Sequence, residues 1–535
     1  MYVMRRSFYI NALLRTAALV PPVMERRCHH AAQSPPSKIL FSRYQMVFVH
    51  MDSEIGNKTA TATSAGAADE DATQSVKIGY VGGGSRGWAY TLINDLAQCT
   101  DMSGEVVLYD LDYESAQRNA EFGNWVQERE GAVGEWTYTA VEDRSAALEG
   151  ADFVILSTQD PPAETMAHEI DIPSEYGIYQ SVGDTVGPGG VVRAMRTIPV
   201  YRDIALAIEE HCPDAWVLNY TNPMTVCVRA LYEAFPDINA IGCCHEVFHT
   251  QEHFGELVAE YMDEPQPPRT EIDVNVKGIN HFTWIDEATW RGHDLFPLLK
   301  RHSEEVISDR SFDPGDLDDA SYFVDNELVA YALFDRFGIF PAAGDRHLAE
   351  FVPWFLSVDD PDEIQSWGIK LTPSEYRVER QEDALDKFYD PMEGDEEFEF
   401  FDSGEEGVSM MRALLGGERL RTNVNVPNEG QAPDLPAGTV VETNALFTRG
   451  EVTPLAAGEL PPQVHNAVST HVQNQETIVE AAFAGDVDLA FQAFLNDPLV
   501  SVPITDAEAM FRDLIEAVEP YLQSHWDLDG AAVLS

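Results

Sequence analysis

The chain has 535 residues, of which 44% are hydrophobic, enough to bury the cores of two or three domains. Its formal net charge of −57 opposes binding to nucleic acid or anionic membranes and is typical of halophilic proteins, whose salt-rich cytoplasm screens the repulsion. Six irregularly spaced cysteines predict a reducing cytoplasm rather than a disulfide framework, and no stretch has the roughly 20 uncharged apolar residues that span a bilayer.

The first 50 residues differ from the rest in charge. They contain seven Lys or Arg and one acidic residue, Glu25, whereas the acidic composition begins at Met51. The apolar run 10–20 is broken by Arg15 and lacks a clear small-residue cleavage site, which argues against a secretory signal. We therefore expect a disordered leader over residues 1–74 and a true translation start near Met51, with a targeting leader as the alternative.

The first predicted strand, residues 76–81, runs into a glycine-rich turn and then a helical pattern that continues to Leu96. Glycines at this spacing let the backbone approach a pyrophosphate, whose charge the helix N-terminus favours. The next predicted strand, 106–109, leads into an aspartate, which can bind the ribose 2′-OH and repel a 2′-phosphate. We therefore predict that NAD is bound in preference to NADP by Gly82, Gly84, Ser85, Arg86, Gly87 and Asp110.

Strands and helices continue to alternate up to about residue 265. Strands are predicted at 153–157, 216–218 and 238–241, and helices at 113–131, 191–211 and 223–235. This alternation predicts an α/β fold with a Rossmann-like, doubly wound parallel sheet over residues 75–265. From 266 to 525, shorter strands followed by helices predict an α+β C-terminal domain. We expect this domain to contribute to the substrate and metal sites and to oligomerisation.

Polar residues follow three predicted strands, at 157–160, 219–223 and 243–246, and ligands of doubly wound sheets bind at such carboxyl ends. In the third cluster Cys244 offers a thiolate, and farther along the chain His281 offers an imidazole. This pair suits a borderline divalent transition metal. The alternative is that both are ordinary core residues.

Two other segments carry signals of a site. The loop 176–190 contains five glycines, which predicts either close approach of the backbone to a ligand or another subunit, or a plain turn-rich connection. Asp345, Arg346 and His347 are consecutive between apolar neighbours. They predict a base and a carboxylate-binding guanidinium, with a structural ion pair as the alternative.

Taken together, the motifs resemble the NAD- and metal-dependent glycoside hydrolases of family 4, whose fold is similar to that of lactate and malate dehydrogenases. The resemblance extends over most of residues 76–500 and rests on the segments 82–85, 219–223, 242–245, 278–282 and 428–430. Residues 177–196 and 343–351 are most similar to the α-galacturonidase branch of that family.

The resemblance implies a hydrolase for α-glycosides of a uronic acid that departs from the usual two-carboxylate scheme. A hydride would pass from sugar C3 to bound NAD⁺ and acidify the proton on C2, and loss of that proton would drive elimination of the glycosidic oxygen. Water would then add at C1 and the hydride would return. A divalent metal, Mn²⁺ by family likeness, would stabilise the enediolate.

The family's functional residues can be matched to positions of this chain. Its metal-binding cysteine and histidine fall on Cys244 and His281, the acid that follows the cysteine falls on His245, and the sugar-binding asparagine falls on Asn222. The base varies within the family, and we predict Asp345.

Alternatives are open for the base and for the cation that a uronate carboxylate requires. The other candidates for the base are Tyr322, His347 and an activated water. For the cation we predict Arg346, with Arg193 and Arg196 as alternatives.

Two other functions are compatible with the sequence: an NAD-dependent dehydrogenase of a sugar or hydroxy acid, and a non-catalytic NAD-binding regulatory protein. A dehydrogenase would reduce NAD stoichiometrically, whereas the hydrolase would not. Family likeness predicts a homodimer or homotetramer acting on a small glycoside or oligo-uronide, and the sugar could be a galacturonide, glucuronide, glucoside or galactoside.

Overall fold

The computed structural model describes residues 74–534, except 160–162, 309–316, 318–321, 324, 357, 359–360, 378, 380–391, 393, 395–397 and 523–525. The predicted leader therefore lies outside the described residues apart from Gln74, at which the first strand begins. The described residues belong to one compact unit.

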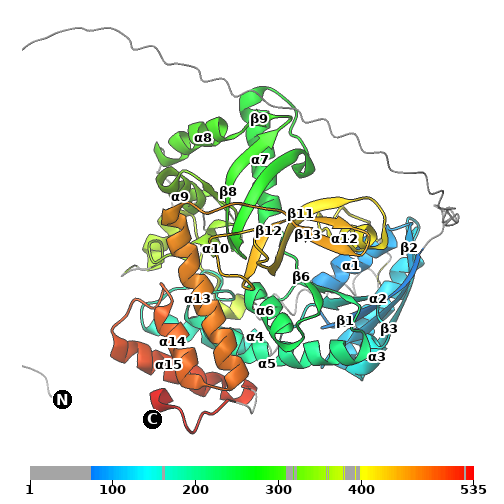
Figure 1. The fold of residues 1–535 in the computed structure, drawn as a ribbon, viewed down its shortest axis with the longest axis horizontal. Helices are drawn as coiled ribbons and strands as arrows, with labels where there is room; N and C mark the ends of the chain where they lie inside the picture. Colours follow the sequence, from blue (N-terminus) through cyan, green and yellow to red (C-terminus); the bar gives the residue numbers. More distant parts are fainter. Residues whose placement is uncertain are drawn as a thin grey trace, which may run out of the picture. The chain divides into compact units, whose positions relative to one another are not determined.

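A nine-stranded sheet organises this unit (Figure 1). Six of its strands are parallel and follow the order β3-β2-β1-β4-β5-β6, which is that of a doubly wound dinucleotide-binding sheet, so the predicted Rossmann-like fold is confirmed. The strands are β1 (Gln74–Val81), β2 (Met102–Tyr109), β3 (Glu135–Val141), β4 (Phe153–Leu156), β5 (Trp216–Asn219) and β6 (Asn239–Gly242). Central strands of parallel sheets are buried on both faces and need continuous apolar runs, and all four residues of β4 are buried.

Helices cover both faces of this sheet. One apolar core contains residues of α1 and α2, and another contains residues of α5 and α6. The helices of this half are α1 (Trp88–Ala97), α2 (Tyr113–Gln127), α3 (Arg144–Leu148), α4 (Ala163–Glu175), α5 (Gly187–His211), α6 (Met224–Ala234) and α7 (Glu246–Met262). The sequence patterns predicted β1, β2, β4, β5, β6, α1, α2, α5 and α6 but not β3, α3, α4 or α7.

Strands from the second half of the chain are divided between two sheets. β11 (Leu420–Pro427), β12 (Val440–Thr448) and β13 (Glu451–Pro454) extend the nine-stranded sheet, where β11 runs antiparallel to β6. A separate antiparallel sheet contains β7 (Ile272–Ile279), β8 (Phe282–Trp290), β9 (His293–Asp294) and β10 (Phe340–Pro341). The C-terminal part is thus α+β, but it shares a sheet with the first half, and the predicted boundary near 265 does not separate two independent sheets.

The helices of the second half pack against the antiparallel sheet and contribute to the apolar cores on both faces of the large sheet. They are α8 (Phe296–Ser308), α9 (Leu328–Phe337), α10 (Asp345–Leu348), α12 (Gly407–Leu415), α13 (Pro462–Ala484), α14 (Val487–Asn496) and α15 (Ile504–Val518). Short 3₁₀ helices occupy Arg269–Glu271, Pro361–Trp367, Glu519–Tyr521 and Ala532–Leu534.

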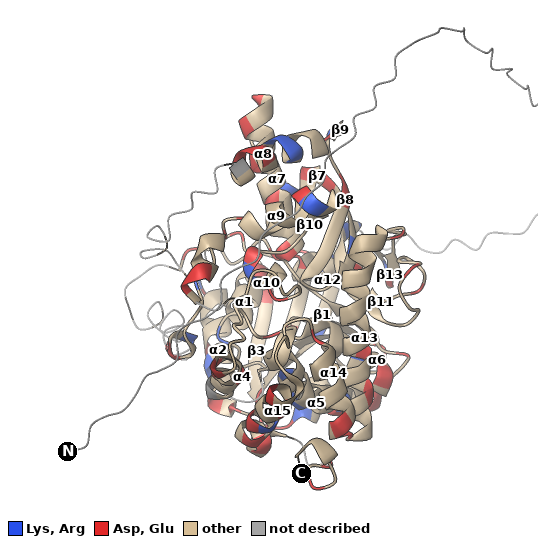
Figure 2. Ribbon diagram, turned by 90° about the vertical axis from the view of Figure 1, so that its left-hand side faces the viewer, with Lys and Arg blue, Asp and Glu red and all other residues tan. Residues whose placement is uncertain are grey.

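Acidic residues are scattered over the outer helices and turns, including α8, α13 and α15, and basic residues are few (Figure 2). Among the described residues, no helix is both long and apolar enough to cross a bilayer.

Candidate active site

A cleft of about 560 Å³ opens at the carboxyl ends of β1, β2 and β4, and we name it the glycine-turn cleft. Gly82 forms the turn beneath it: its φ is +86°, and a Cβ there would lie 2.1 Å from the carbonyl oxygen of Ser157. The N–H of Gly84 donates to Oδ2 of Asp110 at 2.9 Å and holds that carboxylate in the wall. The predicted cofactor residues that line the cleft are Gly84, Ser85, Arg86, Gly87 and Asp110.

A second hollow of about 430 Å³, the central cavity, adjoins the cleft, because Trp88, Asp184, Tyr220 and Asn222 line both. The segment after β6, the β7–β8 turn and α10 supply much of the remaining wall. The lining residues considered below are Cys244, His245, Glu246, His281, Asp325, Arg346, His347 and Arg377.

His281 reaches the central cavity because it lies in a tight hairpin turn. Ile279 pairs with Phe282, so Asn280 and His281 form the whole connection between β7 and β8. His281 takes a left-handed backbone conformation, with φ of +62°, and is buried. The hydroxyl of Thr185 lies 2.9 Å from its Nδ1, which leaves Nε2 available to a ligand.

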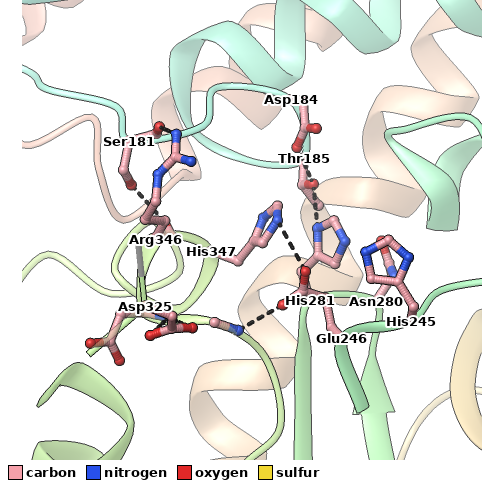
Figure 3. Close-up of polar contacts among 12 residues, drawn as sticks. Ser181, Asp184, Thr185, His245, Glu246, Asn280, His281, Asp325, Arg346 and His347 are labelled. Carbon is pink, nitrogen blue, oxygen red and sulfur yellow. Dashed lines mark hydrogen bonds and ion pairs between the residues drawn. The ribbon is translucent and has the colours of Figure 1, made fainter. Parts of the chain in front are cut away.

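Three side chains are close enough to hold a metal ion together. Asp184, His281 and His347 each offer a ligand atom, and these atoms lie within 4.8 Å of one another (Figure 3). Burial and the adjacent His347 lower the pKa of His281 to about 3, so this imidazole is neutral, as a metal ligand must be. Burial alone would raise the pKa of Asp184, but the two histidines and Arg193 outweigh it and lower that pKa to about 2. A neutral imidazole beside an ionised carboxylate fits a divalent cation.

His245 lines the same cavity at the N-terminal end of α7. Its Nδ1 lies 2.9 Å from Oε1 of Glu405. Burial alone would lower the pKa of His245, but the hydrogen bond and charge of Glu405 raise it above the ordinary value. A raised pKa favours the protonated imidazole, which is the form that can act as an acid.

Two protein-family models match this chain. One, described as family 4 glycosyl hydrolase, matches residues 77–260, and the other, described as family 4 glycosyl hydrolase C-terminal domain, matches residues 276–500. The chain belongs to family 4 of the glycosyl hydrolases. The resemblance inferred from the motifs is thus confirmed.

Within family 4, the chain is similar to alpha-galacturonidases. It is 48% identical over 453 residues to that of Thermoanaerobacterium saccharolyticum, covering 84% of this chain and 96% of the relative. It is 45% identical over 449 residues to that of Bacillus subtilis, covering 83% and 97%.

Solved structures agree with the fold. A crystal structure of a candidate glucosidase from Bacillus subtilis matches with a TM-score of 0.77 at 44% identity, covering 82% of this chain and all of that one. A 6-phospho-alpha-glucosidase from gut microorganisms, in complex with NAD and Mn²⁺, matches with a TM-score of 0.68 at 21% identity, covering 85% and 99%. At 21% identity, the similarity to the 6-phospho-alpha-glucosidase shows a shared fold.

In this family 4 enzyme the two predicted metal ligands, Cys244 and His281, line one cavity. Burial raises the pKa of the Cys244 thiol well above its ordinary value, and Glu442 and Glu246 raise it further. A bound cation is the counter-charge that would favour the thiolate in such surroundings.

The predicted substrate residues also lie at the central cavity. Oδ1 of Asn222 is buried and has no hydrogen-bond partner among the described residues, so it is free to accept from a sugar hydroxyl. Arg346 lines the cavity, and Arg193 lines the glycine-turn cleft. Arg196 instead pairs with Glu169 in the core, which removes it as a candidate for the substrate carboxylate.

Asp345, the predicted base, does not lie in the wall of the central cavity. Its Oδ1 accepts the N–H of Ala330 at 2.9 Å, in the first turn of α9. Burial, with the nearby Asp325, raises its pKa well above the ordinary value. A buried carboxyl group that caps a helix and does not line the cavity is poorly placed to take a proton from a sugar, so this geometry does not fit the predicted base.

Sequence reasoning assigned no role to four cavity residues with carboxylate or guanidinium groups: Asp184, Glu246, Asp325 and Arg377. Asp184 lies in the glycine-rich loop, so a search for carboxylates in that loop would have found it. Glu246 directly follows His245, and its Oε2 accepts the N–H of Gly344 at 2.7 Å. Nothing in their local sequence distinguishes Asp325 or Arg377.

Proposed function

We propose that this family 4 enzyme is an α-galacturonidase-like hydrolase that cleaves α-glycosides of a uronic acid with the help of NAD and a divalent metal. The observation that carries the proposal is the junction of two sites: the glycine-turn cleft and the central cavity share four lining residues. A nucleotide laid along the turn would therefore end beside a sugar in the cavity. The alpha-galacturonidase relatives support the substrate class.

The residues present fit both NAD and a divalent metal. The cleft residues Gly84 to Gly87, with Asp110, would hold NAD over the turn formed by Gly82. Cys244 and His281 would hold the metal, and Asp184, whose carboxylate lies close to His281, offers a third ligand atom. When bound, NAD accepts and returns a hydride and Mn²⁺ polarises the sugar oxygens, and both groups are bound in the 6-phospho-alpha-glucosidase of the same fold.

Two arginines suit a sugar carboxylate. The guanidinium groups of Arg346 and Arg377 both donate to the carbonyl of Ser181 and so lie side by side in the wall. The Nε of each is buried with no hydrogen-bond partner among the described residues. A uronate carboxylate could accept from both, because charge-assisted bonds to guanidinium favour this pairing.

The proton transfers are assigned to two histidines. His245 donates a proton to the departing glycosidic oxygen. With the metal assigned to Cys244, His281 and Asp184, His347 is left to replace Asp345 as the base that removes the C2 proton. Its Nε2 lies 3.7 Å from Oε1 of Glu246, and its Nδ1 is buried with no hydrogen-bond partner among the described residues. An imidazole beside a carboxylate is a common general base.

The acidic surface supports a halophilic enzyme that works in the cytoplasm. Asp and Glu number 91 against 34 Lys and Arg, so the folded state needs salt to screen its own repulsion. We expect the unfolding temperature to rise between 0.1 and 2 M KCl. An unchanged or falling value would contradict halophily, and light scattering in the same buffers would test the homodimer or homotetramer.

The deciding experiment is cleavage of 4-nitrophenyl α-galacturonide with NAD⁺, Mn²⁺, reductant and high salt, with the glucuronide, galactoside and glucoside alongside. We expect release of nitrophenol from the galacturonide with no net formation of NADH. Accumulation of one NADH per sugar would instead identify a dehydrogenase. Bound NAD without turnover of any sugar would identify a regulatory protein.

A further inference from the structure

We propose that Glu405 is a positioning residue that holds His245 so that only its Nε2 can deliver a proton to the leaving group. The proposal rests on the proposed function, in which His245 is the acid.

The contact between the two residues fixes the imidazole tautomer. Oε1 of Glu405 lies 2.9 Å from Nδ1 of His245, and the Glu405 side chain is 17% exposed. A carboxylate can only accept, so Nδ1 must carry a hydrogen in both the neutral and the charged ring. Nε2 is then the one ring nitrogen of His245 that Glu405 does not occupy.

Glu405 makes this contact from outside the central cavity. It is not among the cavity's lining residues, whereas His245 is. Instead it lines two neighbouring hollows on the side of α1 and α12. Glu405 therefore acts on the sugar only through His245, which separates a positioning role from a catalytic one.

The segment that carries Glu405 is itself anchored. Its backbone N–H donates to Oγ of Ser403 at 3.1 Å, and the Ser403 hydroxyl donates to Oδ2 of Asp95 in α1 at 2.7 Å. The next residue, Glu406, is 2.8 Å from Nη1 of Arg269. A carboxylate on a fixed segment restricts the ring orientation more than solvent could.

Two other aromatic rings lie close to the His245 ring. Its centroid lies 5.9 Å from that of Trp88 and 5.0 Å from that of His249. Trp88 lines both the cleft and the cavity. With Glu405 on Nδ1 and these rings beside it, His245 has little freedom to turn Nε2 away from the cavity.

A double-mutant cycle with two leaving groups tests the proposal. Glu405→Gln should lower kcat about 10- to 100-fold on methyl α-galacturonide, whose leaving group needs protonation, and by less than about threefold on the 4-nitrophenyl glycoside, whose leaving group does not. His245→Ala should show the same pattern more strongly. Glu405→Gln added to His245→Ala should cause no further loss.

Two further variants keep the cycle interpretable. Glu406→Gln, which alters the same segment through Arg269, should not change the ratio of the two activities. Glu405→Asp restores a carboxylate and should recover part of the loss on the methyl glycoside if Glu405→Gln folds poorly.

The role of Glu405 would be overturned if Glu405→Gln lowered kcat equally for both leaving groups. It would also be overturned if Glu405→Gln lowered kcat as much in the His245→Ala background as in the wild type. A wild type that cleaves only neutral glycosides would overturn the uronide assignment instead, and the same cycle on those glycosides would still test Glu405.

Discussion

The hydroxyl of Thr185 lies 2.9 Å from Nδ1 of His281, and both residues are buried. The contact joins the glycine-rich loop before α5 to the β7–β8 hairpin, which are about a hundred residues apart in sequence. It occupies one nitrogen of His281 and leaves Nε2 for a metal, beside the Asp184 carboxylate. The first prediction concerns the thiol proposed to share that metal.

Cys244→Ser should abolish metal-dependent cleavage and leave NAD binding within about threefold of wild type, because the cleft does not include residue 244. Bound Mn²⁺, NAD affinity by fluorescence and nitrophenol release measure the three effects. Cys99→Ser is the control, since Sγ of Cys99 donates to Asp101 and a serine hydroxyl can do the same. Full activity in Cys244→Ser would refute the ligand role.

Asp110→Ser should reduce the preference for NAD over NADP by about tenfold or more, because it removes a negative charge from the wall of the cleft. Affinities for the two nucleotides, measured by titration of intrinsic fluorescence, give the ratio. A ratio that stays at its wild-type value would mean that Asp110 does not face the ribose.

Arg377→Met should lower kcat/KM for a uronide about 10- to 100-fold, the effect of losing one charge-assisted hydrogen bond. Activity on the matching neutral galactoside should change little, since that sugar has no carboxylate. Arg421→Met, which removes an exposed ion pair with Asp273, is the control. The same loss on both sugars would argue for a structural role of Arg377.

Asp345→Asn should keep activity within about threefold, because the amide oxygen can still accept the N–H of Ala330. His347→Gln should lose about 10²- to 10⁴-fold, as expected for removal of a general base. Exchange of the C2 hydrogen with D₂O, followed by NMR, reports the base directly. Loss of exchange in Asp345→Asn with exchange intact in His347→Gln would restore Asp345 as the base.

Asp95→Asn should change the pH dependence of stability. Burial, with Glu405 and Asp402 nearby, raises the pKa of Asp95 to about 6, while hydrogen bonds from Ser403 and Asn94 oppose the rise. Between about pH 4 and 6 the folded state then binds more protons than the unfolded state, so Asp95 costs stability as pH rises through this window.

The variant lacks that cost, and its stability relative to wild type should increase by up to about 2 kcal/mol from pH 4 to pH 7. Urea unfolding at the two pH values, in the same high salt, measures the difference. A difference that does not change with pH would contradict the raised pKa.

The sequence by itself determined the features that depend on local chain geometry. The strand, glycine turn and helix that begin at residue 74 are encoded by residues close together in the sequence. The turn, for example, needs a positive φ, which Gly82 supplies. The clusters after β4, β5 and β6 also converged as predicted, because the carboxyl ends of parallel strands meet at one edge of the sheet.

The tertiary structure alone decided which polar residues face the cavity. Asp345, Arg346 and His347 are consecutive in α10, and successive side chains of a helix point about 100° apart, so at most some of them can face one cavity. Asp345 accepts a hydrogen bond from α9, whereas Arg346 and His347 line the central cavity. Glu405 meets His245 across 160 residues, and no local pattern encodes that contact, because it arises only when the fold brings the two segments together.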